Sequence, residues 1–227
     1  MKSPTYLGSE DHKRISGAVS KAEADSAGEI VTILADRSDD YADVALAWAI
    51  LASFAAITVF SLFPQAYLTR LDWLIGRWHG EWTLQQVLAL SLGIGALKFL
   101  AVMAIQLIQS VKFLLIPPPI KTARVHERAV RAFRIGAERR THGRTGILIY
   151  LSMREHRAEI VADEAIASRV EPDVWGDAME AMLSELRQGR TTDGMIAAIE
   201  RVGAVLAEHF PRATDDINEL PDRLIEV

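Results

Sequence analysis

The run Glu29-Ile30-Val31-Thr32-Ile33-Leu34-Ala35 is short, rich in β-branched residues and bounded by turn-forming residues, so it predicts a buried β-strand. A single strand is not stable alone and needs partners in a sheet. The other strand candidates lie far along the chain: Ile147-Leu148-Ile149-Tyr150-Leu151 and its expected antiparallel neighbour Ala158-Glu159-Ile160-Val161-Ala162. We therefore expect residues 1–43 and 117–227 to build one α/β domain, with the first two strands parallel.

Helical patterns surround these strands. The first helix is expected from Ser9, read as its capping hydroxyl, to about Asp25. The helix after the three prolines at 117–119 supplies the crossover between the parallel strands, with its apolar stripe facing the sheet. The motif Thr191-Thr192-Asp193 is expected to cap the last helix, and the acidic tail from Pro211 to wrap the surface.

Two apolar stretches, residues 44–63 and 84–116, interrupt this domain. Each is long enough to cross a bilayer as a helix, which takes about 20 mostly apolar residues. The connection at residues 64–83 carries Tyr67, Trp73, Trp78 and Trp82, aromatic residues that favour the lipid headgroup level. The sequence therefore predicts an inserted two-helix transmembrane hairpin with an interfacial loop.

Charge asymmetry predicts the orientation of this hairpin. The connecting loop offers only Arg70 and Arg77, whereas a dense basic block follows the second stretch. Because basic residues stay on the cytoplasmic side, we expect a multi-pass protein of the plasma (inner) membrane with a short outer loop and both termini in the cytoplasm. The chain has no cysteine, which excludes disulfides and thiolate sites.

The basic block has a second interpretation beyond topology. Arg124, Arg128, Arg131 and Arg139 are expected to meet anionic lipid headgroups, so that membrane lipids are predicted partners. Nucleic acid is not expected, because the stacking aromatics and glycines of RNA-binding modules are missing. Lys98, deep in the second apolar stretch, either pairs with a functional group or snorkels to the membrane surface.

Several short motifs stand out in the sequence. They are Gly28-Glu29-Ile30-Val31-Thr32-Ile33, Thr145-Gly146-Ile147-Leu148-Ile149-Tyr150, Arg157 with Glu159-Ile160-Val161-Ala162-Asp163, Asp193-Gly194, and the ending Asn218-Glu219-Leu220-Pro221-Asp222-Arg223-Leu224. Together they resemble the TPM domain family, and in particular its bacterial integral-membrane branch. The resemblance implies a TPM-like αβα sandwich. For some relatives it also implies a weak acid phosphatase activity or a divalent cation site.

Carboxylate side chains are the only groups in the sequence that plausibly bind a metal ion or take part in catalysis. Asp36, Asp39 and Asp40 follow the first strand, and Asp163 with Glu164 follow the third. Either group offers hard oxygen ligands to Ca²⁺ or Mg²⁺. The alternative, which we favour because turns select Asp for backbone reasons, is that these are solvated acids of a linker and a turn. The expected strand directions place the two groups at opposite edges of the sheet, so they are not expected to form one site.

Three functions remain open from the sequence. The first is a membrane-anchored, non-enzymatic accessory, assembly or regulatory factor with a membrane protein partner. The second is a divalent-cation-dependent phosphatase or related hydrolase at the membrane, and the third is a lipid-surface element built on the basic helix. The six histidines lack metal spacing, and no signature for a nucleophile occurs, so the sequence does not decide whether the protein is an enzyme.

Overall fold

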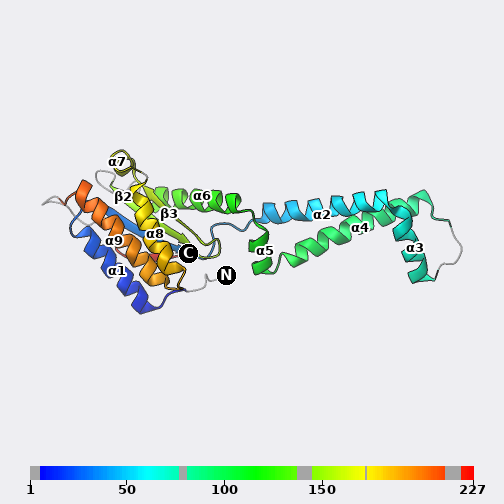
Figure 1. Cartoon of the computed structure of the whole chain (residues 1–227), viewed down its shortest axis with the longest axis horizontal. Coiled ribbons are helices and arrows are strands. Elements are labelled where there is room, and N and C mark those ends of the chain that lie inside the picture. Colours follow the sequence, from blue (N-terminus) through cyan, green and yellow to red (C-terminus); the bar gives the residue numbers. More distant parts are fainter. Residues whose placement is uncertain (1–5, 77–80, 137–144, 172, 213–220) are drawn as a thin grey trace. The chain divides into compact units, whose positions relative to one another are not determined.

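The computed structural model describes residues 6–76, 81–136, 145–171, 173–212 and 221–227. The chain divides into two compact units (Figure 1). The α/β unit combines Met1–Asp39 with Pro118–Val227, and the hairpin unit is Asp40–Pro117. Each is described by itself below.

A four-stranded mixed sheet forms the centre of the α/β unit, in the order β3-β2-β1-β4. The predicted pairing of β1 (Glu29–Ala35) with β2 (Gly146–Ser152) is confirmed: the strands are parallel, with Ile30 opposite Ile147. β3 (Arg157–Ala162) is antiparallel to β2, also as predicted. The sequence reading missed β4 (Leu224–Glu226), which pairs in parallel with β1.

Helices cover both faces of this sheet (Figure 1). On one face α1 (Ser9–Glu23), α8 (Val174–Leu186) and α9 (Thr191–His209) pack on Ile30, Leu34, Ile147, Ile149 and Leu151. Alternate residues of the strands point to the other face, where α6 lies, as the two-residue period of a strand requires. A short helix, α7 (Glu164–Ala167), follows β3. The unit is thus an αβα arrangement.

The crossover helix α6 (Pro118–Gly136) packs as its sequence predicts. Its buried stripe, Val125, Ala129 and Phe133, forms a second core with Ile33, Ala35, Leu148 and Tyr150 of the sheet. The charged residues between these positions are thereby left on the outer face of the helix.

Two helix starts differ from the sequence prediction. The N-cap of α1 is Gly8, and Ser9 is already inside the helix; the Asp11 carboxylate accepts the Gly8 N–H at 3.1 Å. The N-cap of α9 is Arg190, whose guanidinium has no acceptor for the free backbone N–H groups. Thr192 lies inside the helix, and its hydroxyl donates to Asp11 of α1. The predicted capping hydroxyls are therefore used elsewhere or not at all.

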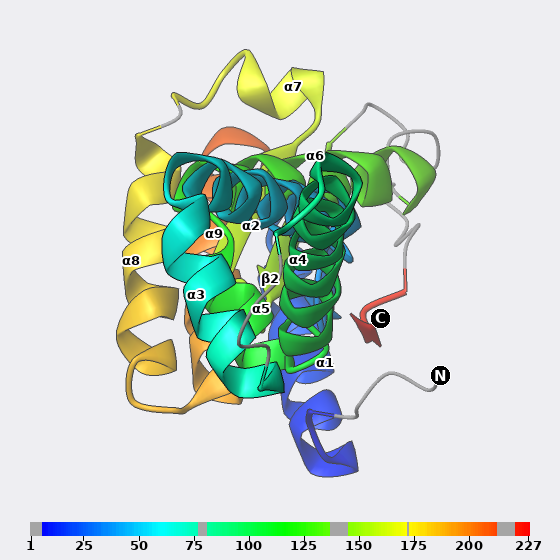
Figure 2. The ribbon, with the colours of Figure 1, turned by 90° about the vertical axis from the view of Figure 1, so that its right-hand side faces the viewer.

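The hairpin unit is built on two long apolar helices, α2 (Ala42–Leu62) and α4 (Leu84–Ile105), which lie side by side (Figures 1 and 2). Both are long and apolar enough to cross a membrane, by length and composition. The connection contains a helix, α3 (Pro64–Ile75), where a loop was expected. The second apolar stretch is also not one helix, because it turns after Ile105 and resumes as α5 (Gln109–Leu115).

Close contacts fix the register of α2 against α4. Gly95 of α4 is buried, and the Ser53 hydroxyl donates to its carbonyl oxygen at 2.9 Å. Near the other end of the pair, the Gln106 side-chain amide donates to the Ala45 carbonyl at 3.0 Å. Beyond the far end, Trp82 donates to the Asp72 carboxylate, which ties the connection together. The two helices are therefore antiparallel and tightly paired.

Candidate functional site

Polar side chains gather at the carboxyl ends of the parallel strands. β1, β2 and β4 run in the same direction, so Asp36, Ser152 and Glu226 come to one edge. The starts of α1 and α9 lie there too, because Glu226 accepts a hydrogen bond from Leu7 and Thr192 donates to Asp11. Open α/β sheets bind ligands at such an edge, so we take it as the candidate site.

Asp36 is held by two neighbours at this edge. The Arg154 guanidinium Nε lies 2.9 Å from its Oδ1, and the Tyr6 hydroxyl donates to the same carboxylate. Burial by itself raises the pKa of Asp36, but the hydrogen bonds from Tyr6 and Arg154 outweigh it and lower that pKa below its ordinary value. Asp36 is therefore an ionised carboxylate with a cation already beside it.

A buried network of hydroxyls and one carboxylate lies next to Asp36. The Ser152 hydroxyl donates to Glu155 Oε2 at 2.6 Å, and the Ser38 N–H donates to Glu155 Oε1 at 2.9 Å. The Ser38 hydroxyl reaches Ser152 Oγ at 3.0 Å and lies 3.1 Å from the Tyr150 hydroxyl. Ser152 and Glu155 are almost wholly buried. The network fixes the segment that leaves β1, and burial raises the pKa of Tyr150.

The other acids predicted as metal ligands are dispersed. Asp39 Oδ2 lies 3.4 Å from Nε of Arg124 on α6, and Asp40 is exposed at the start of the hairpin unit. Asp163 is buried beside the amino end of β2, where its N–H donates to the Gly146 carbonyl, and Glu164 begins α7. The two acid groups thus lie at opposite edges of the sheet, as the strand directions predicted. The described residues contain no group of three or more His, Asp or Glu side chains suited to a metal ion.

The basic residues predicted to meet lipid differ in their surroundings. Arg128 and Arg131 of α6 are both exposed, and Arg128 also interacts with the hydroxyl group of Tyr150 on the sheet. Arg124 is engaged by Asp39 and, at 3.6 Å, by Glu127. Arg139 lies outside the described residues. Among the described members of the set, Arg128 and Arg131 are the most accessible.

Comparison with known proteins finds a family match for part of the chain. Residues 114–205, which run from the end of α5 through α6, the β2–β3 pair and α8 into α9, match the model of the TPM domain. The structure is similar to the NMR structure of the BA42 protein from the psychrophilic bacterium Bizionia argentinensis. The TM-score is 0.57 at 20% identity, and the match covers 100% of this chain and 99% of that one. That likeness shows a shared fold. No curated protein matches the chain closely enough to count as a relative.

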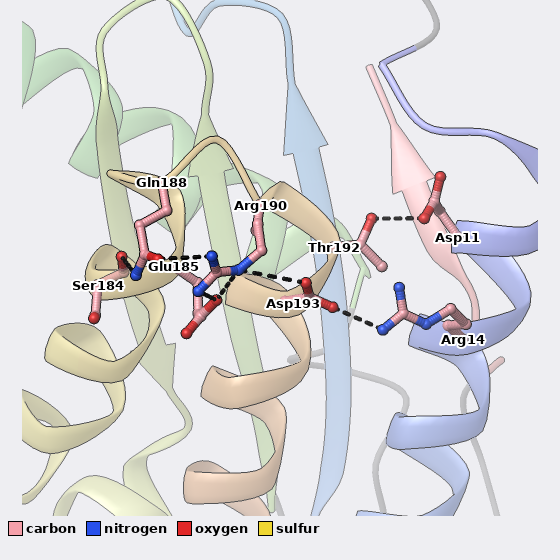
Figure 3. Close-up of polar contacts among 8 residues, drawn as sticks. All are labelled: Asp11, Arg14, Ser184, Glu185, Gln188, Arg190, Thr192 and Asp193. Carbon is pink, nitrogen blue, oxygen red and sulfur yellow. Dashed lines mark hydrogen bonds and ion pairs between the residues drawn. The ribbon is translucent and has the colours of Figure 1, made fainter.

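The Asp193-Gly194 motif of the TPM match has a structural use in this chain (Figure 3). Asp193 binds Arg14 of α1 at 2.7 Å. A Cβ on Gly194 would lie 3.0 Å from the Met182 carbonyl oxygen, so glycine allows α9 to approach α8. Figure 3 also shows Arg190 between Glu185 and Asp193, at 2.6 and 3.7 Å. These contacts lock α1, α8 and α9 together.

The sequence reading missed a buried carboxyl group at the opposite edge of the sheet in the α/β unit. Glu23, at the end of α1, accepts the Ile30 N–H at 2.7 Å. It lines a pocket of about 190 Å³ with Ser20, Ser26, Glu29, Arg212 and Asp222. Burial, assisted by the nearby Glu29 and Asp222, raises the pKa of Glu23 to about 8. The helical pattern around Glu23 carries no signal for this burial.

Proposed function

We propose that this protein is a membrane-anchored TPM module that acts as a non-enzymatic accessory, assembly or regulatory factor for a membrane protein complex. In this proposal α2 and α4 cross the inner membrane, the α3 connection is outside, and both termini are cytoplasmic. An even number of spans leaves both parts of the α/β unit on one side, where they can pair. The basic residues that follow the second span favour the cytoplasmic side.

The observation that carries the proposal is the exposed apolar surface of the hairpin unit. Leu51 and Phe54 of α2 are 58% and 66% exposed, and Leu92 and Leu100 of α4 are 70% and 63% exposed. A patch of this kind on a protein in water promotes aggregation, whereas lipid covers it without loss. Both helices also satisfy their backbone hydrogen bonds internally, as the hydrocarbon core demands.

The ion pairs at the carboxyl edge favour the accessory role over hydrolysis. Arg154 and Arg124 lie against Asp36 and Asp39, two of the acids that a metal-dependent hydrolase would use. A divalent cation at Asp36 has to compete with a guanidinium 2.9 Å away. These carboxylates are thereby better suited to fixing the loop after β1 than to binding Ca²⁺ or Mg²⁺.

A divalent-cation-dependent phosphatase or related hydrolase is the second candidate. Its support is the network of Ser38, Ser152 and Glu155, which places hydroxyl groups and a buried carboxylate beside Asp36 at the edge where α/β folds bind ligands. In this case Asp36, Asp39 and Asp40, or Asp163 and Glu164, would hold Ca²⁺ or Mg²⁺. The cation would supply charge neutralisation on a phosphoryl oxygen.

One pair of measurements separates the two candidates. The full chain in detergent is assayed with an aryl phosphate and with millimolar Ca²⁺, Mg²⁺ or Mn²⁺, and its melting temperature is recorded. The accessory role predicts no turnover and no cation-dependent rise in melting temperature. Turnover that disappears in Asp36→Asn or Asp163→Asn, but survives in the exposed control Asp177→Asn, would establish the hydrolase instead.

The partner side of the proposal has its own test. The full chain is cross-linked in native membranes and then purified in detergent. The accessory role predicts a stoichiometric integral membrane partner that is retained by Asp36→Asn. Recovery of the chain without any membrane protein contradicts the accessory role.

Lipid contact through α6 is part of the same proposal. Arg128 and Arg131 are exposed and follow the hairpin unit closely in sequence, and each basic residue near an anionic surface contributes about 1 kcal/mol. The full chain is reconstituted through α2 and α4 into nanodiscs of mixed anionic and neutral lipid, and replacing both arginines by Gln is expected to reduce the enrichment of anionic lipid around the protein. The control replaces Arg187 and Arg201 by Gln, which removes the same charge from the end of α8 and from α9. Equal effects of the two double variants contradict a lipid role for α6.

A further inference from the structure

Lys98 is the only Asp, Glu, Lys or Arg residue in α4. Its side chain is exposed, and among the described residues it makes no ion pair or hydrogen bond. It lies 14 residues from Leu84 and 7 from Ile105, or about 21 Å and about 10 Å along the axis at 1.5 Å per residue. If α4 crosses the membrane, as proposed above, Lys98 lies within the hydrocarbon layer.

The direction of α4 disfavours extension of the Lys98 side chain toward the nearer membrane surface. Side chains on a helix tilt toward its N-terminus, and the N-terminus of α4 is the outer, more distant end. The ammonium therefore points along the longer path. A charge left unpaired at the centre of a spanning helix costs about 2.5 to 3.5 kcal/mol on insertion scales, so an ion-pair partner for Lys98 stabilises the inserted helix.

The hairpin itself does not supply that partner. The contacts of Gly95 with Ser53 and of Gln106 with Ala45 place Lys98 near the level of Ala52 on α2. The only ionisable residue of α2 is Asp43, which precedes Ala52 by nine residues and so lies about 14 Å from it along the helix axis, at 1.5 Å per residue. A second copy of the chain brings a second lysine to this level and no carboxylate. Charge complementarity thus requires a different protein.

We infer that the flank of α4 around Lys98 docks against a transmembrane helix of another protein that carries an Asp or Glu side chain at the depth of Ala52. This inference rests on the proposed membrane span. Lys98 is one turn from Gly95, which is buried against α2, so it borders the seam between the two helices. A third helix seated there contacts both α2 and α4, and its carboxylate neutralises the ammonium.

Photo-crosslinking in native membranes tests this inference. The full chain carries p-benzoylphenylalanine at Ala101, on the Lys98 flank, or at Ala96, which is exposed on the opposite side of α4. The expected result is an adduct from position 101 to a membrane segment with Asp or Glu in its apolar span, and little from position 96. Lys98→Leu is expected to reduce that adduct about tenfold, the change that corresponds to 1.4 kcal/mol. Lys98→Arg is expected to retain it.

A charge exchange completes the test. Lys98→Asp combined with Lys in place of the partner's carboxylate is expected to restore the adduct. Adducts only to lipid, to a second copy of this chain or to a segment without a carboxylate overturn the inference, as does an adduct that Lys98→Leu leaves unchanged.

Failure of the span is distinguished from failure of docking by the cysteine-free background. A single cysteine at Ala52 is protected from a membrane-impermeant maleimide on both sides if α2 spans the bilayer. Labelling at position 52 contradicts both the proposed membrane span and the docking inference that rests on it. Protection at position 52 without the adduct from position 101 contradicts the docking inference alone.

Discussion

Helices α9 and α4 are of similar length and both are rich in apolar residues, but they use them differently. α9 buries Met195, Ile199, Val202 and Leu206 against α1, α8 and the sheet. In α4, the one described residue that is buried is Gly95, while Leu92 and Leu100 are exposed. Apolar content therefore does not decide burial. The two helices differ in how apolar residues are distributed around the helix. α9 has one apolar face and one polar face, whereas α4 is apolar around its whole circumference, as a lipid-facing helix is.

The largest expected difference between the two units comes from the same Leu→Ala change in each. Leu148 is fully buried in β2, so Leu148→Ala is expected to reduce the free energy of unfolding of the α/β unit by about 2 to 5 kcal/mol. Leu100→Ala is expected to change that free energy by less than about 0.5 kcal/mol, because Leu100 belongs to the hairpin unit and is 63% exposed. Hydrogen exchange of the β2 amides in detergent measures the effect of both variants. Comparable losses from the two variants contradict this expectation.

Glycine positions sharpen the comparison. A Cβ on Gly203 would lie 2.6 Å from the Ala22 Cβ and 3.2 Å from its Cα, so Gly203→Ala forces α9 away from α1 and is expected to cost about 1 to 3 kcal/mol. Gly95→Ala meets the end of the Ile57 side chain, which can rotate, and is expected to cost less. Gly17→Ala meets nothing within 4 Å and is expected to stabilise α1 by about 1 kcal/mol. Thermal unfolding in detergent gives the ranking, and a stabilised Gly203→Ala would break it.

Glu23 predicts a pH dependence confined to the α/β unit. Its pKa is about 8 in the folded chain and near 4.5 when unfolded, so the folded state holds the extra proton between these values. The contribution of the Glu23 carboxyl group to the free energy of unfolding is therefore fully present below pH 4.5 and is lost as the pH rises through 8. The free energy of unfolding of Glu23→Gln is therefore expected to fall by roughly 1 to 3 kcal/mol less than that of the unchanged chain over this pH range, allowing for solvent screening. Unfolding at pH 5 and pH 8.5 measures it, with the exposed Glu10→Gln as control; parallel profiles contradict the assignment.

The smallest expected effect lies within the hairpin unit. Gln106→Leu removes the hydrogen bond to the Ala45 carbonyl, and such bonds between membrane helices contribute about 0.6 kcal/mol. The matched control is Gln109→Leu, at an exposed position of α5. Loss of helical circular dichroism on heating in detergent gives both midpoints. A lower midpoint for Gln109→Leu than for Gln106→Leu is inconsistent with this register of α2 and α4.

Local patterns predicted the parts of the fold that rest on local chemistry. β-branched runs located β1 and β2, and the need of β1 for a partner predicted their parallel pairing. β4 was missed because three residues, Leu224 to Glu226, carry no pattern of their own and pair only through Thr32 to Leu34. The turn after Ile105 was missed because the apolar run continues through it.

The candidate site was only partly predictable for a related reason. Asp36 and Asp39 were identified because they follow a strand, but their arginine partners lie far along the chain. Ser38 and Glu155 are 117 residues apart in sequence, and no local signal connects them. Likewise, nothing in the helical pattern around Glu23 predicts that its carboxyl accepts the Ile30 N–H. Long-range polar contacts of this kind require the structure.

The most direct test of the account is the accessibility of single cysteines, which the cysteine-free chain allows without background. Cysteines replace Trp73 in α3, Leu92 in α4 and Val227 at the carboxyl end, and intact cells are treated with a membrane-impermeant maleimide before and after lysis. The account predicts labelling at position 73 in intact cells, at position 227 only after lysis, and at position 92 in neither case. Labelling of 73 and 227 from the same side, or of 92 from water, contradicts the proposed membrane hairpin.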